Sequence, residues 1–264
     1  MTQTPQKEPG GEPFPRREFE AVCFHALGLI DQNREYLQMH LKESGDDRTR
    51  QALADMELET ARLDRTLGEM MDLMALEQEP PRPRWFDLCD VLRQASALQE
   101  EVALQVRVQL VVECEVESCP VRGVPEEAEL LVFHLLSNAL LATAPGGKVR
   151  LQLCCTEESR TLTVTDDGCG LPGPANWQEN RRRFLGGAGA GLKLCRAVCR
   201  RAGWGFSLED RPRRGAEARV TLPAAEADTP PLHSTVELYE NGGQPLSRLR
   251  WQLARELRLL AEKA

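Results

Sequence analysis

Three closely spaced prolines, Pro80, Pro81 and Pro83, divide the chain into two parts with different patterns. A proline lacks the amide hydrogen that a helix interior needs, so a helix that approaches this segment has to end there. Upstream, mostly apolar residues recur at alternating spacings of four and three, as on the face of a helix that packs against other helices. They are Met56, Thr60, Leu63, Leu67, Met70 and Met74. Downstream, short apolar runs alternate with helical segments. The break therefore predicts a helical domain followed by an α+β domain.

The helical part is expected to be a hairpin over residues 16–78. Its first helix covers about residues 15–41, with Cys23, Leu27 and Ile30 on one side, and a turn at residues 44–47 leads into a second helix over about residues 48–76. Two antiparallel helices alone enclose little apolar core. We therefore expect the hairpin to pair with that of a second copy, which gives a homodimer built around a four-helix bundle.

The second part, residues 84–223, is expected to form a mixed sheet covered by helices on one face. Helices are predicted at 88–101, 125–143 and 190–202, and strands at 105–112, 115–121, 148–155, 160–166, 205–210 and 216–222. Two further segments complete the domain organisation. Residues 1–15 are rich in proline and glycine and read as a disordered tail. Residues 224–264 read as a linker followed by a C-terminal amphipathic helix at about 245–262.

Charge and composition exclude several classes of protein. A formal net charge of -8 argues against a nucleic-acid binder or a protein of anionic membrane surfaces, because its field repels phosphates. The sequence has no run of eighteen apolar residues and no apolar leader at its start, so neither a membrane span nor a signal peptide is expected. The nine cysteines include no CxxC pair, which favours reduced thiols. We expect a cytoplasmic protein.

Three segments of the second part carry side chains suited to nucleotide binding. They are Asn138 within a helix, the run Asp166-Asp-Gly-Cys-Gly170 directly after a strand, and Gly187-Ala-Gly-Ala-Gly-Leu192 at the start of a helix. A carboxylate at a strand end can accept the adenine amine, and an amide oxygen is a suitable ligand for Mg²⁺. Glycines at a helix N-terminus let backbone N–H groups approach phosphate.

Each segment is weak evidence by itself. An Asp-Asp-Gly run is most often a turn, and an isolated helical Asn is most often a cap for a neighbour. A Rossmann dinucleotide site is a poor fit, because no strand leads into Gly187 and no acidic residue follows at the expected distance. The order and spacing of the three segments together favour one nucleotide site.

In that order, LLSNA (135–139), DDGCG (166–170) and GAGAGL (187–192) resemble the N, G1 and G2 boxes of bacterial two-component sensor histidine kinases, whose catalytic domain is a GHKL-type α/β-sandwich ATPase. The hairpin is similar too, since Phe19 precedes His25 by six residues, as in the family's H box. Trp85-Phe-Asp-Leu88 resembles the entry to the catalytic domain. The resemblance covers roughly residues 16–223.

The resemblance implies ATP and Mg²⁺ as cofactors and autophosphorylation of His25, with transfer to an aspartate of a response-regulator receiver domain. It makes Asn138 the Mg²⁺ ligand and Asp166 the adenine anchor. The nucleotide loops would contain Gly168, Gly170, Gly187, Gly189, Gly191 and Leu192.

Two departures keep other functions open. Ala26 stands where the family usually has an acidic proton acceptor, and His134 stands where many members have a first N-box asparagine. Loss of general-base help typically slows a reaction about 10²–10⁴-fold. A degenerate kinase or phosphotransfer scaffold that binds a response regulator therefore remains an alternative. A serine kinase or a conformational ATPase of the same superfamily is a further one.

Overall fold

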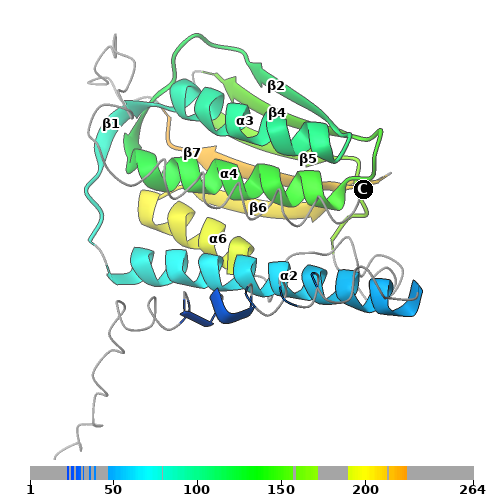
Figure 1. Cartoon of the computed structure of the whole chain (residues 1–264). Coiled ribbons are helices and arrows are strands. Elements are labelled where there is room, and N and C mark those ends of the chain that lie inside the picture. Colours follow the sequence, from blue (N-terminus) through cyan, green and yellow to red (C-terminus); the bar gives the residue numbers. More distant parts are fainter. Residues whose placement is uncertain are drawn as a thin grey trace, which may run out of the picture.

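The structure, a computed structural model, describes residues 23, 25, 26, 28–30, 32, 36, 39, 47–78, 80–156, 159–171, 190–212 and 214–224. Figure 1 shows a sheet with helices stacked on one face and a long helix beneath them. The elements are α2 (Asp47–Gln78), β1 (Arg84–Asp87), α3 (Leu88–Gln105), β2 (Gln109–Cys114), β3 (Pro120–Gly123), α4 (Pro125–Ala142), β4 (Lys148–Cys155), β5 (Arg160–Asp166), α6 (Ala190–Ala202), β6 (Gly205–Asp210) and β7 (Ala216–Leu222).

The main sheet has five strands in the order β2-β4-β5-β7-β6. β2 pairs with β4 in parallel, and all other neighbours are antiparallel, so the expected mixed sheet is confirmed. Burial along β5 alternates with a period of two, which turns Leu162, Val164 and Asp166 toward the interior. The strand therefore delivers its last residue, a carboxylate, into the protein.

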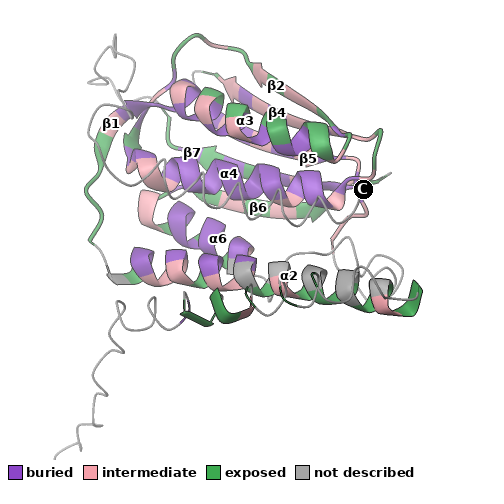
Figure 2. Ribbon diagram, viewed as in Figure 1, coloured by how far each residue is buried: buried purple, intermediate pink, exposed green. Residues whose placement is uncertain are grey.

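The helices α3, α4 and α6 cover one face of this sheet, as the sequence predicted (Figure 1). The central helix α4 is buried along almost its whole length, as Figure 2 shows. It is apolar on nearly all sides because it packs against α3, α6 and the sheet together. Pro125 opens it at the first helical position, where a missing amide hydrogen costs nothing.

A two-stranded sheet of β1 and β3 was not predicted in this form. The sequence predicted no strand at Arg84–Asp87, and it placed the strand after β2 at 115–121, whereas β3 covers Pro120–Gly123. The two short strands pair antiparallel across more than thirty residues of chain. Asp87 fixes the junction, because its Oδ1 accepts hydrogen bonds of 2.9 Å from the backbone N–H of both Cys89 and Cys119.

The second helix of the predicted hairpin is present as α2, which extends over 32 residues. Its predicted apolar seam is largely uncovered, since Met56, Leu63 and Met70 are 42–49% exposed. The buried face of α2 is a different one, and it packs against α6. Figure 2 shows this burial on the C-terminal half of the helix, while its N-terminal end is exposed. The sequence did not predict this contact.

The described residues between 23 and 39 are helical, with Cys23 buried and His25 exposed. The four-helix bundle of a dimer remains a prediction. The predicted tail at 1–15 and the predicted helix at about 245–262 lie outside the described residues. All nine cysteines are described and are free thiols, as expected. No helix in the described part of the chain has the length and apolar character that a membrane span needs.

Candidate functional site

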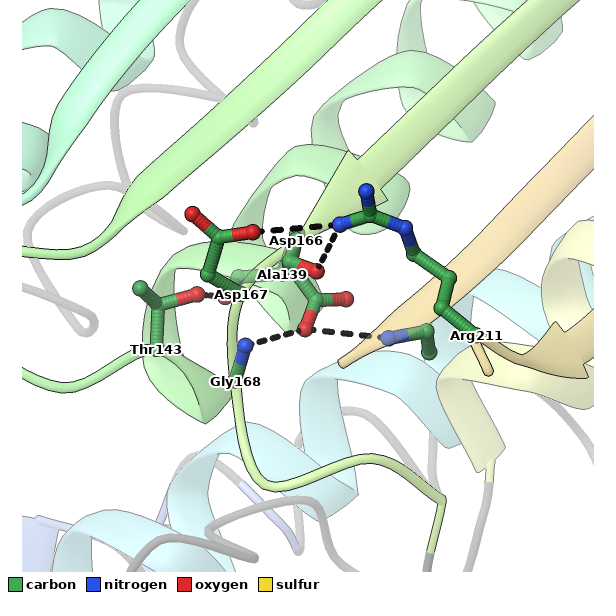
Figure 3. Close-up of polar contacts among 7 residues, drawn as sticks. Ala139, Thr143, Asp166, Asp167, Gly168 and Arg211 are labelled. Atoms are coloured by element: carbon green, nitrogen blue, oxygen red, sulfur yellow. Dashed lines mark hydrogen bonds and ion pairs between the residues drawn. The ribbon is translucent and has the colours of Figure 1, made fainter. Parts of the chain in front are cut away.

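The carboxylate of Asp166 lies at the centre of the site. The side chain is 6% exposed, and its Oδ1 accepts a hydrogen bond of 2.8 Å from the backbone N–H of Gly168 (Figure 3). The same oxygen accepts a second one, of 3.2 Å, from the backbone N–H of Ala216. No described residue donates a hydrogen bond to its second oxygen, Oδ2. The backbone therefore orients the carboxylate through one oxygen and leaves the other to accept a donor from a ligand.

Burial raises the pKa of Asp166 above its ordinary value of 3.8. The two backbone hydrogen bonds and the positive charge of Arg211 act in the opposite direction. Arg211 donates from Nη1 to the carbonyl oxygen of Asp166 at 2.8 Å and to Oδ1 of Asp167 at 3.1 Å (Figure 3). Sequence reasoning missed Arg211, which follows β6 and reaches the end of β5 across the intervening strand.

Close contacts within the protein require glycine at two positions of this loop and at one position of the turn before β7. A Cβ at Gly168 would lie 2.6 Å from the carbonyl oxygen of Ala142, and a Cβ at Gly215 would lie 1.9 Å from that of Asp166. Gly170 has a φ of +77°, and a Cβ there would lie 2.7 Å from a carboxylate oxygen of Asp210. The loop after β5 is therefore clamped between the end of α4 and the turn before β7.

Asn138 lies near the C-terminal end of α4, half-buried, and the end of this helix adjoins the Asp166 loop. The backbone N–H of Cys169 donates to the carbonyl oxygen of Ala142, and Thr143 closes the helix by donating from Oγ1 to the carbonyl oxygen of Ala139 at 2.7 Å. The structure thus brings the predicted Mg²⁺ ligand and the predicted adenine anchor to one end of the helical layer.

The amide oxygen of Asn138 already has a partner from another part of the chain. Nη2 of Arg65, on α2, donates to Oδ1 of Asn138 at 2.7 Å, and Nε of Arg65 donates to Glu69 at 2.9 Å. Glu69 in turn reaches the start of α6, because a Cβ at Gly191 would lie 2.9 Å from its Oε1. The sequence alone did not indicate a role for either Arg65 or Glu69.

Not all of the other residues singled out in the sequence are described by the structure. Gly191 and Leu192 open α6, with Gly191 buried and Leu192 half-buried. Gly187 and Gly189 lie outside the described residues. His134 is 3% exposed, and its Nε2 lies 4.0 Å from a carboxylate oxygen of Asp72. The side chain of His25 is exposed.

The donor set fits a nucleotide better than a metal held by protein alone. The described residues contain no group of three His, Cys, Asp or Glu side chains that could hold an ion. A single amide such as Asn138 would therefore need phosphate oxygens to complete the coordination of Mg²⁺. The oriented, buried carboxylate of Asp166 fits the exocyclic amine of adenine.

Residues 123–226 match the family of histidine kinase-, DNA gyrase B- and HSP90-like ATPases. Sensor protein DivL of Caulobacter vibrioides is 30% identical over 190 residues, which cover 68% of this chain and 24% of DivL. Sensor histidine kinase RppB of Synechocystis is 27% identical over 185 residues, 65% of this chain and 40% of RppB.

The chain belongs to the sensor histidine kinases.

A solved structure of the histidine kinase ThkA in complex with the response regulator TrrA has the same fold, with a TM-score of 0.54 and 19% identity. The match covers 79% of this chain and 61% of that one. This histidine kinase chain spans only about a quarter of DivL and two fifths of RppB. The matched ATPase region contains Asn138, Asp166 and the start of α6, and therefore most of the candidate site.

Proposed function

We propose that this chain is the ATP-dependent core of a protein-histidine kinase that transfers the γ-phosphate of ATP to His25 and then to an aspartate of a response-regulator receiver domain. The observation that carries the proposal is the buried carboxylate of Asp166, oriented by two backbone amides inside a domain of the histidine kinase ATPase family. This arrangement supplies a buried, oriented carboxylate as a hydrogen-bond acceptor for adenine.

In this proposal each part of the site has a separate task. Asp166 accepts the adenine amine through Oδ2, and the buried start of α6 at Gly191 presents backbone N–H groups to phosphate. Asn138 holds Mg²⁺ through Oδ1, and the ion offsets negative charge on the phosphates. The side chain of His25 is exposed to solvent, and in this proposal one of its ring nitrogens attacks the γ-phosphate. Attack forms a nitrogen–phosphorus bond, breaks the bond between the γ-phosphorus and the oxygen that bridges it to the β-phosphate, and releases ADP. The proton on the other ring nitrogen passes to water.

We also propose that the chain works as a homodimer through its helical hairpin. Met56, Leu63 and Met70 recur every seven residues on α2 and are 49%, 44% and 42% exposed. A stripe of large apolar side chains at this spacing is the pattern that a partner helix covers. A response regulator as the second partner is supported by the fold shared with ThkA, whose structure was solved with the regulator TrrA.

The test is transfer of label from γ-labelled ATP in the presence of Mg²⁺. Wild type should acquire acid-labile phosphate, and His25→Gln should acquire none while it still binds ATP. His40→Gln is the matched control, because it removes a histidine to which no role is assigned, and it should label like wild type. A receiver domain added to labelled protein should then remove the label. Equal labelling of His25→Gln and wild type would rule out His25 as the acceptor.

A second candidate is a degenerate kinase that binds nucleotide and a response regulator without phosphorylating itself. The observation that favours it is Ala26, which leaves no acidic side chain next to His25. This candidate predicts that wild type binds Mg–ATP in a titration but acquires no label over hours. Slow, His25-dependent labelling would instead support a kinase that has lost general-base help.

A further inference from the structure

Three polar residues of α2 form what we call the polar stripe: Arg65, Glu69 and Asp72. Their spacings of four and three put them on one side of the helix, opposite the exposed methionines and leucine. They are 5%, 3% and 2% exposed, which is unusual for charged side chains. The side on which they lie faces the candidate nucleotide site, and each member contacts or approaches a residue of its N box or G2 box.

The contact made by Arg65 is incompatible with the proposed role of Asn138. Its Nη2 lies 2.7 Å from Oδ1 of Asn138, the atom that would bind Mg²⁺. A metal on that oxygen would sit about 2.1 Å away from it, and therefore within a few ångströms of the guanidinium. Two cations at that separation in a buried site repel strongly. Asn138 can bind Arg65 or the metal through this oxygen, but not both.

The contact made by Glu69 conflicts with the proposed binding of the ATP phosphates, as that of Arg65 conflicts with the proposed binding of Mg²⁺. A Cβ at Gly191 would lie 2.9, 3.2 and 3.5 Å from Oε1, Cδ and Oε2 of Glu69, so the carboxylate packs closely against Gly191 in the first turn of α6. This helix start is where backbone N–H groups would receive phosphate. A buried carboxylate at that place repels a phosphate and takes up its space.

A separate set of bonds holds α2 in this position. Arg201, on α6, donates to the carbonyl oxygen of Leu76 at the end of α2 and pairs with Glu127 of α4 at 2.8 Å. Apolar residues of similar volume would hold two helices together at least as well as a buried ion pair. The polar stripe is therefore better explained by what it contacts than by the cohesion it provides.

We infer that α2 docks on the ATPase domain as an autoinhibitory element whose polar stripe competes with Mg–nucleotide. Arg65 takes the place of the metal at Asn138, and Glu69 takes the place of phosphate at the start of α6. Nucleotide binding then requires α2 to shift off this surface, so that anything that moves the hairpin also controls access to the site. The inference rests on the proposed function of this site as a Mg–ATP site.

The test compares affinities for a non-hydrolysable ATP analogue with Mg²⁺, measured by calorimetry. The double variant Arg65→Gln, Glu69→Gln removes both charges together, so that neither is left buried without its partner. Its matched control is Arg48→Gln, Glu77→Gln, which makes the same two changes at exposed positions of α2. We expect the double variant to bind about tenfold or more tightly than wild type, in the usual range of coupling between sites, and the control to bind like wild type.

Hydrogen exchange on the wild-type chain gives a second readout that needs no variant. Saturation with the Mg²⁺-loaded analogue should speed amide exchange in residues 62–76 of α2, while adenosine, which lacks phosphates, should leave it unchanged. Equal affinity of wild type and the double variant, or weaker binding by the variant, overturns the inference and leaves the ATP site intact. Absence of binding in every protein overturns the proposed nucleotide site as well, so the two failures are distinguishable.

Discussion

Arg65 donates a hydrogen bond of 2.7 Å to Oδ1 of Asn138, a residue 73 positions further along the chain. This bond links α2 to α4 of the ATPase domain through the side chain that we propose as the Mg²⁺ ligand. In the competition that we propose, Mg–nucleotide and Arg65 cannot both occupy this oxygen, so nucleotide binding moves α2 away from the ATPase domain.

Asp166→Asn should weaken nucleotide binding about tenfold to a hundredfold. The amide keeps an oxygen for the N–H groups of Gly168 and Ala216, so the loop should hold its shape. It replaces the ionised acceptor for adenine, and a hydrogen bond to a charged group is worth about 1.5–3 kcal/mol. Calorimetry with ADP and Mg²⁺ measures the loss.

The control for Asp166 is Asp167→Asn at the next position, whose half-exposed side chain pairs with Arg211. We expect the control to change ADP affinity less than threefold, since the pair lies in contact with solvent. Equal losses in the two variants would show that adenine does not depend on Asp166 in particular.

Gly215→Ala should be strongly destabilising, and Gly146→Ala offers a control at the same φ of +82°. An added Cβ at Gly146 meets no atom within 4 Å, so only the backbone cost of about 1–2 kcal/mol applies. At Gly215 the Cβ would lie 1.9 Å from the carbonyl oxygen of Asp166, and overpacking adds about 1–3 kcal/mol. Urea denaturation of both variants measures the difference in free energy of unfolding, and equal costs would contradict the clamp on the Asp166 loop.

Glu129 should make the fold less stable at alkaline pH. The residue is 3% exposed on α4, and burial, followed by the nearby charge of Glu126, raises its pKa from 4.5 to about 7. The folded state thus favours the protonated form. The contribution of protonated Glu129 to the free energy of unfolding is complete below pH 4.5 and is lost as the pH rises through about 7.

Glu129→Gln removes this titration. At pH 8 the variant should be more stable than wild type by roughly 2 kcal/mol, and the difference should shrink toward zero near pH 5. Urea denaturation at the two pH values measures it, with the exposed helical residue Glu100→Gln as the matched control. A constant difference at both pH values would show that Glu129 does not titrate in this way.

The hydrophobic pattern was sufficient to predict most of the ATPase domain. The period and length of the apolar runs correctly predicted one helix and three strands: Pro125–Ala142, Lys148–Cys155, Arg160–Asp166 and Ala216–Leu222. β1 was missed because four residues after a proline carry no readable alternation, and its strand character depends on pairing with a distant partner. The positions of Asp166 and Asn138 followed from motif order, and the structure brings them to one end of the helical layer.

The contact between α2 and the site was beyond sequence reasoning. Arg65, Glu69 and Asp72 fall off the apolar stripe of α2, and charged residues off such a stripe normally face solvent. Nothing local distinguishes a solvated charge from one that is buried against a domain 60 or more residues away. A hint was available in the spacing of four and three, which puts the three side chains on one side, but their partners are visible only in the fold.

We propose that this site transfers phosphate from ATP to His25. It is tested most directly by incubating the wild-type chain with γ-labelled ATP and Mg²⁺, digesting the protein, and locating the phosphate. We expect acid-labile, alkali-stable phosphate on the peptide that contains His25, absent when Mg²⁺ is removed and absent in Asp166→Asn at low ATP. Acid-stable phosphate on a hydroxyl side chain, or no phosphate on a chain that binds ATP, would contradict it.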